Sequence, residues 1–257
     1  MLCDSHGHLQ MLPDVEIRDA IARARDAGVG RILVPGTTVA DSRRAVEVAE
    51  AHDGILAAVG VHPHEAKDFD ADRDLRVFEE LLASPKAVAI GEIGLDFHYD
   101  HSPRDVQLAA FDVQLDFAAH RALPVLIHNR ESGAEILEAL GRRPVRPDPG
   151  LYHSFTESAD YGRRAIALGF RISFSGMLTF KAAENIRAAA RDLPLAAMLV
   201  ETDAPFLAPE PHRGKRCEPA FVIETARRLA AVKDVALAEV EAATTANFDA
   251  LFGRGRP

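Results

Sequence analysis

Short apolar runs alternate with longer amphipathic stretches along the whole chain, with no long polar linker between them. The short runs are apolar nearly throughout, which is typical of parallel strands that are buried on both faces. We expect a strand before Asp4 and further strands at 31–35, 55–61, 87–90, 124–127, 151–152, 170–174 and 197–200.

The longer stretches have the period and the end signals of helices. Gly28 ends the first of them, and Asp41 is expected to cap the second. Helices are predicted at 18–27, from 41 onward, and at 72–82, 103–120, 134–140, 161–168, 182–190, 219–232 and 238–252.

Strands and helices that alternate eight times in about 250 residues predict a TIM (β/α)₈ barrel, regular or distorted, as a single domain over 1–257. Two smaller domains and an open doubly wound sheet are the alternatives. The doubly wound sheet is disfavoured because its glycine-rich fingerprint should follow the first strand, where His6 and His8 stand instead.

Composition narrows the function classes. Among the 257 residues, 47% are apolar and 27% are charged, which is ordinary for a globular protein. The formal charge of −9 argues against a protein that coats nucleic acid nonspecifically. Two cysteines are too few for a disulfide scaffold. The sequence shows no pattern of a leader peptide and no apolar run long enough to cross a membrane. We therefore expect a soluble cytoplasmic protein with no membrane contact and no obligate protein partner.

Polar residues follow most of the expected strands, at the end where barrel active sites lie. His6 and His8 point the same way from an extended chain. The other residues at this edge are His62, His64, Glu92, His128, His153 and Asp203. Imidazoles and carboxylates suit divalent ions such as Mg, Mn or Zn, and the set is large enough for two ions bridged by Glu92 or by a water. Asp203 could ligate, and could orient or deprotonate a water activated by the ions.

Seven stretches carry a family resemblance. They are 4–8, 60–64, 91–96, 127–128, 153–156, 201–207 and 213–216, the last followed by Glu218 and Pro219. Together they strongly resemble the TatD family of metal-dependent deoxyribonucleases, over Cys3 to about Phe252. The resemblance implies an amidohydrolase-type barrel that hydrolyses phosphodiester bonds in DNA, as an exonuclease, with two divalent ions. Single-stranded DNA or DNA ends are the expected substrate.

The resemblance also implies roles for single residues. The implied metal ligands are His6, His8, Glu92, His128, His153 and Asp203, and Glu92, Asp203 and His64 are the candidate catalytic residues. The resemblance also implies that His62 and His64 contact the substrate phosphate. The alternative is that they are only a pair of loop histidines made rigid by Pro63. Arg213, Lys215 and Arg216 form a local basic cluster suited to phosphate oxygens, unless they are only a solvated loop.

Two positions depart from the family pattern. Cys217 stands where the family commonly has Asn, and Glu157 stands where glycine is usual, so the loop shape and the substrate preference are open.

Two other functions remain possible. A hydrolase of a small ester, lactone or amide would use the same metal chemistry, although Lys86 starts its strand and cannot supply a carbamylated bridge. The other possible function is that of a non-catalytic nucleic-acid-binding protein. Such a protein commonly stacks bases on aromatic side chains, and the absence of Trp and the presence of only three Tyr argue against this.

Overall fold

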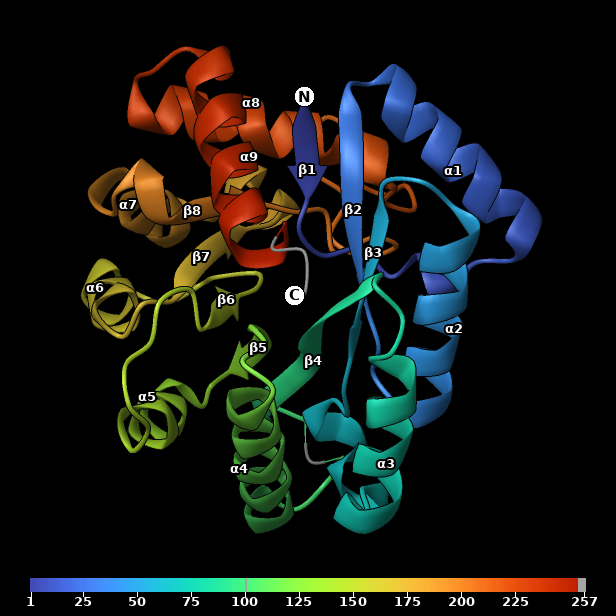
Figure 1. The fold of residues 1–257 in the computed structure, drawn as a ribbon. Coiled ribbons are helices and arrows are strands. Elements are labelled where there is room, and N and C mark those ends of the chain that lie inside the picture. Colours follow the sequence, from blue (N-terminus) through green and yellow to red (C-terminus); the bar gives the residue numbers. More distant parts are fainter. Residues whose placement is uncertain (100, 254–257) are drawn as a thin grey trace.

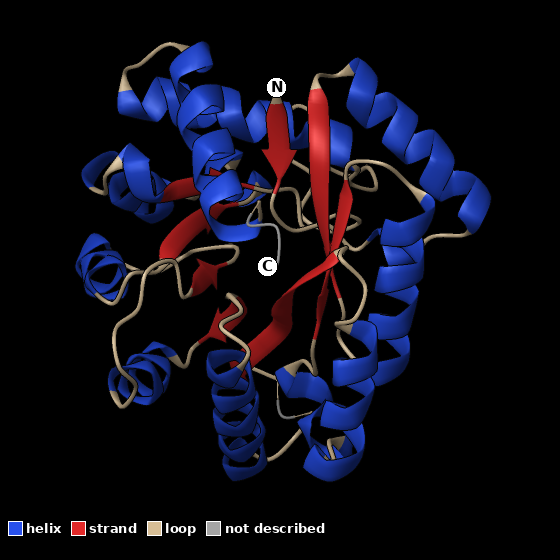
Figure 2. Ribbon diagram, in the orientation of Figure 1, coloured by secondary structure: helices blue, strands red, loops and turns tan. Residues whose placement is uncertain are grey.

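The computed structural model describes residues 1–99 and 101–253. Eight parallel strands lie side by side in chain order and form a nearly closed barrel with helices around it (Figures 1 and 2). The strands are β1 (Leu2–Asp4), β2 (Val29–Pro35), β3 (Ile55–Val59), β4 (Ala87–Asp96), β5 (Val125–Arg130), β6 (Gly150–Tyr152), β7 (Arg171–Phe174) and β8 (Met198–Val200). The predicted single-domain TIM barrel is confirmed.

Each strand leads to a helix on the outside of the ring (Figure 2). The α-helices are α1 (Asp14–Asp26), α2 (Val39–Ala51), α3 (Ala71–Leu81), α4 (Arg104–His120), α5 (Gly133–Gly141), α6 (Ala159–Ala167), α7 (Glu184–Asp192), α8 (Val222–Lys233) and α9 (Leu237–Phe252). Short 3₁₀ turns are η1 (Leu9–Met11), η2 (Pro63–Asp68), η3 (Gly176–Thr179), η4 (Leu195–Ala197) and η5 (Pro219–Phe221).

The start of α2 differs from the prediction. Thr38, not Asp41, caps this helix, because the Thr38 hydroxyl accepts the Asp41 N–H at 3.0 Å. The Asp41 carboxylate is used elsewhere, as the acceptor of the backbone N–H and the hydroxyl of Thr37 and of the amide of Gln10.

β4 is longer than predicted and places Glu92 inside the strand, not after it. The register between β4 and β5 shifts between Ile90 and Ile93, which is the sign of a bulge around Glu92. β5 likewise continues past His128 to Arg130. Both candidate ligands therefore lie on paired strands.

The ends of β1 and β8 close the ring through loop hydrogen bonds. The Ser5 N–H donates to the Val200 carbonyl at 3.1 Å, and the Asp203 N–H donates to the His6 carbonyl at 2.9 Å. Asp4, fully buried, accepts the backbone N–H of Thr202 at 2.9 Å and its hydroxyl at 2.5 Å. This closure brings the loop after β1 against the loop after β8.

The two ends of the barrel have different chemistry. At the end where the strands begin, inward side chains such as Leu33, Leu126 and Leu199 form an apolar cluster with Phe248 and Phe252. The last turn of α9 lies over this opening (Figure 1). Polar residues therefore gather at the other end, where the strands finish. In the described part of the chain, no helix is long and apolar enough to cross a membrane.

A glycine allows β4 and β5 to approach closely beside the candidate ligands. Gly94 has φ +146°, a conformation that residues with a Cβ rarely adopt, and it pairs with His128. A Cβ at this position would overlap the His128 carbonyl oxygen. Gly94 is therefore required by both the backbone angle and the space available.

We expect Gly94→Ala to lower the free energy of unfolding by more than about 2 kcal/mol, because it combines backbone strain with an overlap between strands. Gly141→Ala is the matched control, since a Cβ there meets nothing within 4 Å. It should leave stability unchanged or raise it by up to about 1 kcal/mol. Urea denaturation of both variants measures the difference, and equal midpoints would contradict the prediction.

Candidate metal centre

The six predicted ligands meet around Glu92. Its Oε2 atom lies 3.3 Å from His6 Nε2 and 3.7 Å from His8 Nε2. Its Oε1 atom lies 2.9 Å from both His128 Nδ1 and His153 Nε2. The two oxygens of one buried carboxylate thus face two different pairs of imidazoles.

The first group of donor atoms comes from the loops that close the barrel. His6 Nε2 and His8 Nε2 are 3.2 Å apart, and Asp203 Oδ1 lies 3.4 Å from His8 Nε2 and 3.8 Å from His6 Nε2. These three ligand atoms lie within 4.8 Å of one another. Nitrogen and oxygen donors that converge in this way fit one divalent cation, together with Glu92 Oε2.

The second group comes from strands on the other side of Glu92. His128 Nδ1 and His153 Nε2 are 3.4 Å apart and share Glu92 Oε1. The distal nitrogen of each ring meets a carboxylate: Asp96 Oδ2 lies 3.0 Å from His128 Nε2, and Glu201 Oε1 lies 3.2 Å from His153 Nδ1. A carboxylate behind a histidine is a common arrangement in metal sites, because it orients the ring and leaves the other nitrogen free to bind the ion.

Asp96 and Glu201 have roles that the sequence reasoning did not assign. Both belong to stretches that resemble the family, but neither was separated there from its neighbours. Asp96 is the last residue of β4, and its Oδ1 also accepts the N–H groups of His98 and Tyr99 at 3.0 Å. A carboxylate that follows an apolar run and stands two residues after a glycine was the signal available in the sequence.

Burial and charge together explain how the site titrates. Burial would raise the pKa of Glu92, but His153, His62 and His6 hold it well below its usual range. Burial would lower the pKa of His128 and His153, yet their carboxylate partners raise both, that of His153 strongly. The ionised carboxylates of this pocket therefore require nearby positive charge. A divalent cation supplies it, so the residues present fit a divalent metal ion.

His62 lies closer to the candidate ligands than its expected role suggested. Its Nε2 atom is 3.5 Å from Glu92 Oε1, and it forms a possible ligand group with Glu92 and His128. Burial lowers the pKa of His62 to about 4, so the ring is neutral and has a lone pair to offer. The structure thus brings His62 to the second group as well.

His64 occupies the outer edge of the same cluster. Its Nε2 atom lies 2.9 Å from Asp96 Oδ2, and 27% of its side chain is exposed. Asp96 therefore holds two histidines with one oxygen atom, one at the candidate metal position and one at the rim.

The predicted basic cluster is exposed and partly engaged elsewhere. The Arg213 guanidinium lies 3.8 Å from the centre of the Phe180 ring and donates to the Ala208 carbonyl. Arg216 pairs with Glu16. Within the described residues, no hydrogen bond or ion pair links these two side chains or Lys215 to the histidine cluster.

The two departures from the family pattern lie beside the cluster without joining it. Cys217 is buried against Ala204 and Ala208, and burial raises the pKa of its thiol well above the usual value, so it is not a thiolate ligand. Glu157 accepts the Asn129 amide at 3.1 Å.

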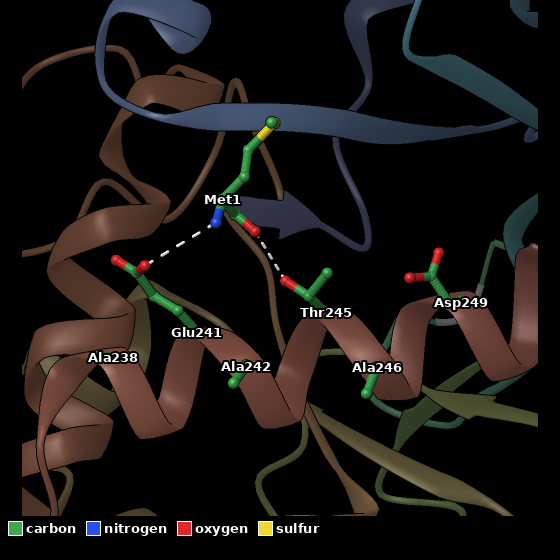
Figure 3. A pocket seen from close by; sticks show the side chains of 7 residues that line it. All are labelled: Met1, Ala238, Glu241, Ala242, Thr245, Ala246 and Asp249. Atoms are coloured by element: carbon green, nitrogen blue, oxygen red, sulfur yellow. Dashed lines mark hydrogen bonds and ion pairs between the residues drawn. The ribbon is translucent and has the colours of Figure 1, made fainter.

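A pocket that lies away from the cluster is shown in Figure 3. Met1 and one side of α9 line it, and the Met1 amino group is 3.9 Å from a Glu241 carboxylate oxygen. Because Met1 precedes β1, this pocket is at the opposite end of the barrel from the candidate ligands and contains none of them.

Known proteins similar to this chain agree with the geometry. A family model described as TatD related DNase matches residues 3–253. The uncharacterized metal-dependent hydrolase YabD of Bacillus subtilis (strain 168) is 39% identical over 98% of this chain and 99% of its own. The uncharacterized metal-dependent hydrolase TatD of Mycobacterium tuberculosis is 33% identical over 99% and 98%.

Solved structures give the same result for the fold. YJJV, a TatD homologue from Escherichia coli K12, superposes with a TM-score of 0.90 at 30% identity and covers 98% of both chains. The phosphotriesterase homology protein from Escherichia coli has a TM-score of 0.67 at 14% identity over 98% of this chain and 95% of its own, which shows a shared fold. The chain belongs to the TatD-related DNase family of metal-dependent hydrolases.

Proposed function

We propose that this metal-dependent hydrolase cleaves phosphodiester bonds in DNA as an exonuclease and uses two divalent ions. The observation that carries the proposal is the placement of Glu92, whose two oxygens face two separate sets of imidazoles. The family description, which names DNase activity, supports DNA as the substrate.

His6, His8 and Asp203 would hold one ion, and His128 and His153 would hold the other, with Glu92 between them and His62 beside the second. Two bound divalent ions would supply a nucleophilic water at neutral pH and stabilise negative charge on the phosphate. The fold holds these ligands before any substrate arrives, because each lies on a strand or on a loop tied to one.

Two side chains of the cluster are placed to act on the substrate. Asp203 is 14% exposed, so its carboxylate reaches the open side of the site and can orient the attacking water and take its proton. His64 is anchored through Nε2 by Asp96, and in its imidazolium form it would donate from Nδ1 to a phosphate oxygen. Arg213, Lys215 and Arg216 remain proposed phosphate contacts.

DNA cleavage tests the proposal directly. End-labelled single-stranded DNA should be shortened from one end by the protein with Mn²⁺ or Mg²⁺, and chelation should abolish this until metal is restored. Asp203→Asn should lower kcat by at least about a hundredfold while DNA is still bound, because it removes a general base. An unaltered protein that hydrolyses only small esters or lactones in a substrate panel would contradict the DNA assignment.

Metal content tests the first ion position. The double substitution His6→Ala and His8→Ala removes two of its nitrogen donors and should reduce bound metal by about one equivalent. His120→Ala is the control, since His120 is an exposed residue at the end of α4. Elemental analysis after metal loading and dialysis gives the ratio of metal to protein. Full metal content in the double variant would refute the assignment.

Asp96 is proposed as a positioning residue for the second ion. Asp96→Asn keeps the size of the side chain but loses the charge that orients His128, so metal affinity should fall about 10–100-fold. Asp105→Asn, an exposed acid in the first turn of α4, should change nothing. Competition with a fluorescent chelator measures both affinities. Equal affinities would show that Asp96 has no part in ordering the site.

A further inference from the structure

A cavity of about 250 Å³ lies at the opposite end of the barrel from the histidine cluster. Helices α4 and α5 and the loop 142–149 surround it, and Val125, the first residue of β5, and Phe170, just before β7, line it from the barrel side. Leu115 of α4 and Leu140 of α5 add further apolar surface. Pockets that bind small molecules are mostly apolar and measure ~300–1,000 Å³, so this cavity suits a compact ligand.

Three charged side chains line the cavity, and two of them neutralise each other. The Arg143 Nη2 atom lies 2.8 Å from Asp116 Oδ1, and Arg143 Nη1 also lies 3.1 Å from Asp112 Oδ1, outside the lining. Arg146 is the third charged residue. The charges on the cavity wall therefore leave one positive charge uncompensated.

Arg146 is held by backbone carbonyls and not by a carboxylate. Its Nη2 atom donates to the Leu123 carbonyl and, at 3.4 Å, to the Pro149 carbonyl. Among the residues that the structure describes, its Nε and Nη1 atoms have no acceptor and the guanidinium has no ion-pair partner. Burial lowers the pKa of Arg146, because no neighbouring negative charge opposes the loss of water. A partly buried cation in this state is stabilised by any anion that reaches it.

We infer that this cavity binds a small organic monoanion, with its carboxylate on Arg146 and its apolar body against Leu115, Leu140 and Phe170. A guanidinium carries five N–H donors, and the three on Nε and Nη1 are those without a described acceptor. A single uncompensated charge matches a monoanionic carboxylate better than a phosphate monoester dianion. The site is remote from the histidine cluster and does not depend on the proposed DNA hydrolysis.

A neighbouring cavity is less suitable for such an anion. Arg146 also lines this second space, of about 220 Å³, which lies beside the last turn of α9. Asp148 lines it too, so a carboxylate would meet a like charge there. The apolar cavity has no such opposition beyond the paired Asp116, and its lining residues Ala119 and Val145 are exposed, so a ligand can enter from solvent.

Isothermal titration calorimetry of the full chain tests the site with 3-phenylpropionate and octanoate as probes, and with 3-phenylpropanamide as the neutral counterpart of the first. At least one acid should bind with a Kd of about 10 µM to 1 mM, as expected for a ligand of about ten heavy atoms. The amide should bind about 10–100-fold more weakly than its acid, because it loses the charge-assisted hydrogen bonds to Arg146.

Two variants of α4 locate the binding. Ala119→Leu fills part of the cavity from an exposed position and should abolish binding of both acids. Ala109→Leu is the matched control, since it makes the same change at an exposed position of α4 outside the cavity and should leave the affinities unchanged.

Two variants of Arg146 test the charge. Arg146→Met keeps an apolar stem and should reduce the affinity for 3-phenylpropionate to that for the amide. Arg146→Lys restores a cation and should recover a preference for the acid. Thermal midpoints of all variants are measured alongside, so that loss of binding is compared only between folded proteins.

Three results would overturn the inference. One is that neither acid binds at millimolar concentration. Another is equal affinity for acid and amide, because the cavity would then not recognise an anion. The third is acid binding that survives Ala119→Leu, because the anion would then be held elsewhere, the metal centre included. Failure to cleave DNA would overturn the proposed function alone and leave this site unaffected.

Discussion

The buried carboxylate of Glu92 is the constraint on which this end of the barrel depends. Removing one charge from water costs on the order of several kcal/mol unless partners compensate for it. Five imidazoles lie within 3.7 Å of its oxygens, from His6, His8, His62, His128 and His153. Asp203, Asp96 and Glu201 add further negative charge, so imidazoles alone balance the pocket only by holding protons. A divalent cation held by each group would resolve this without protonating the ligands.

The barrel makes such a concentration of charge possible because all its strands point the same way. Parallel strands finish at one end, where side chains separated by two hundred positions in sequence meet. The opposite end is filled by small and branched apolar residues and by Phe248, Leu251 and Phe252 of α9. Burial at this apolar end, and in the larger apolar layer between the strands and the surrounding helices, stabilises the fold, while the polar end carries charges that add little to stability.

Sequence alone was sufficient for the barrel and for the set of residues at its rim, because both depend on local patterns. Apolar runs identify strands, and the residue after a strand end must lie at the rim. The position of Glu92 within β4 was not predictable in this way, since the bulge between Ile90 and Ile93 changes which residue points inward. Gly91 and Gly94 were the only local indications.

Pairings between side chains were beyond the reach of the sequence for another reason. That Asp96 holds both His64 and His128, or that Glu201 holds His153, depends on the distances between strands and not on the spacing along one strand. The proximity of His62 to Glu92 has the same origin.

The charges outside the cluster limit how a polyanion could bind. Arg216 is paired with Glu16, and Arg213 lies over Phe180, so two of the three cations in the basic loop already have partners. Affinity that came only from phosphate neutralisation would require many free cations along a track. The structure instead gathers its candidate ligands within one small cluster around Glu92. The proposed phosphodiesterase would therefore engage a single phosphate at this cluster, which favours the end of a strand over the middle of a duplex.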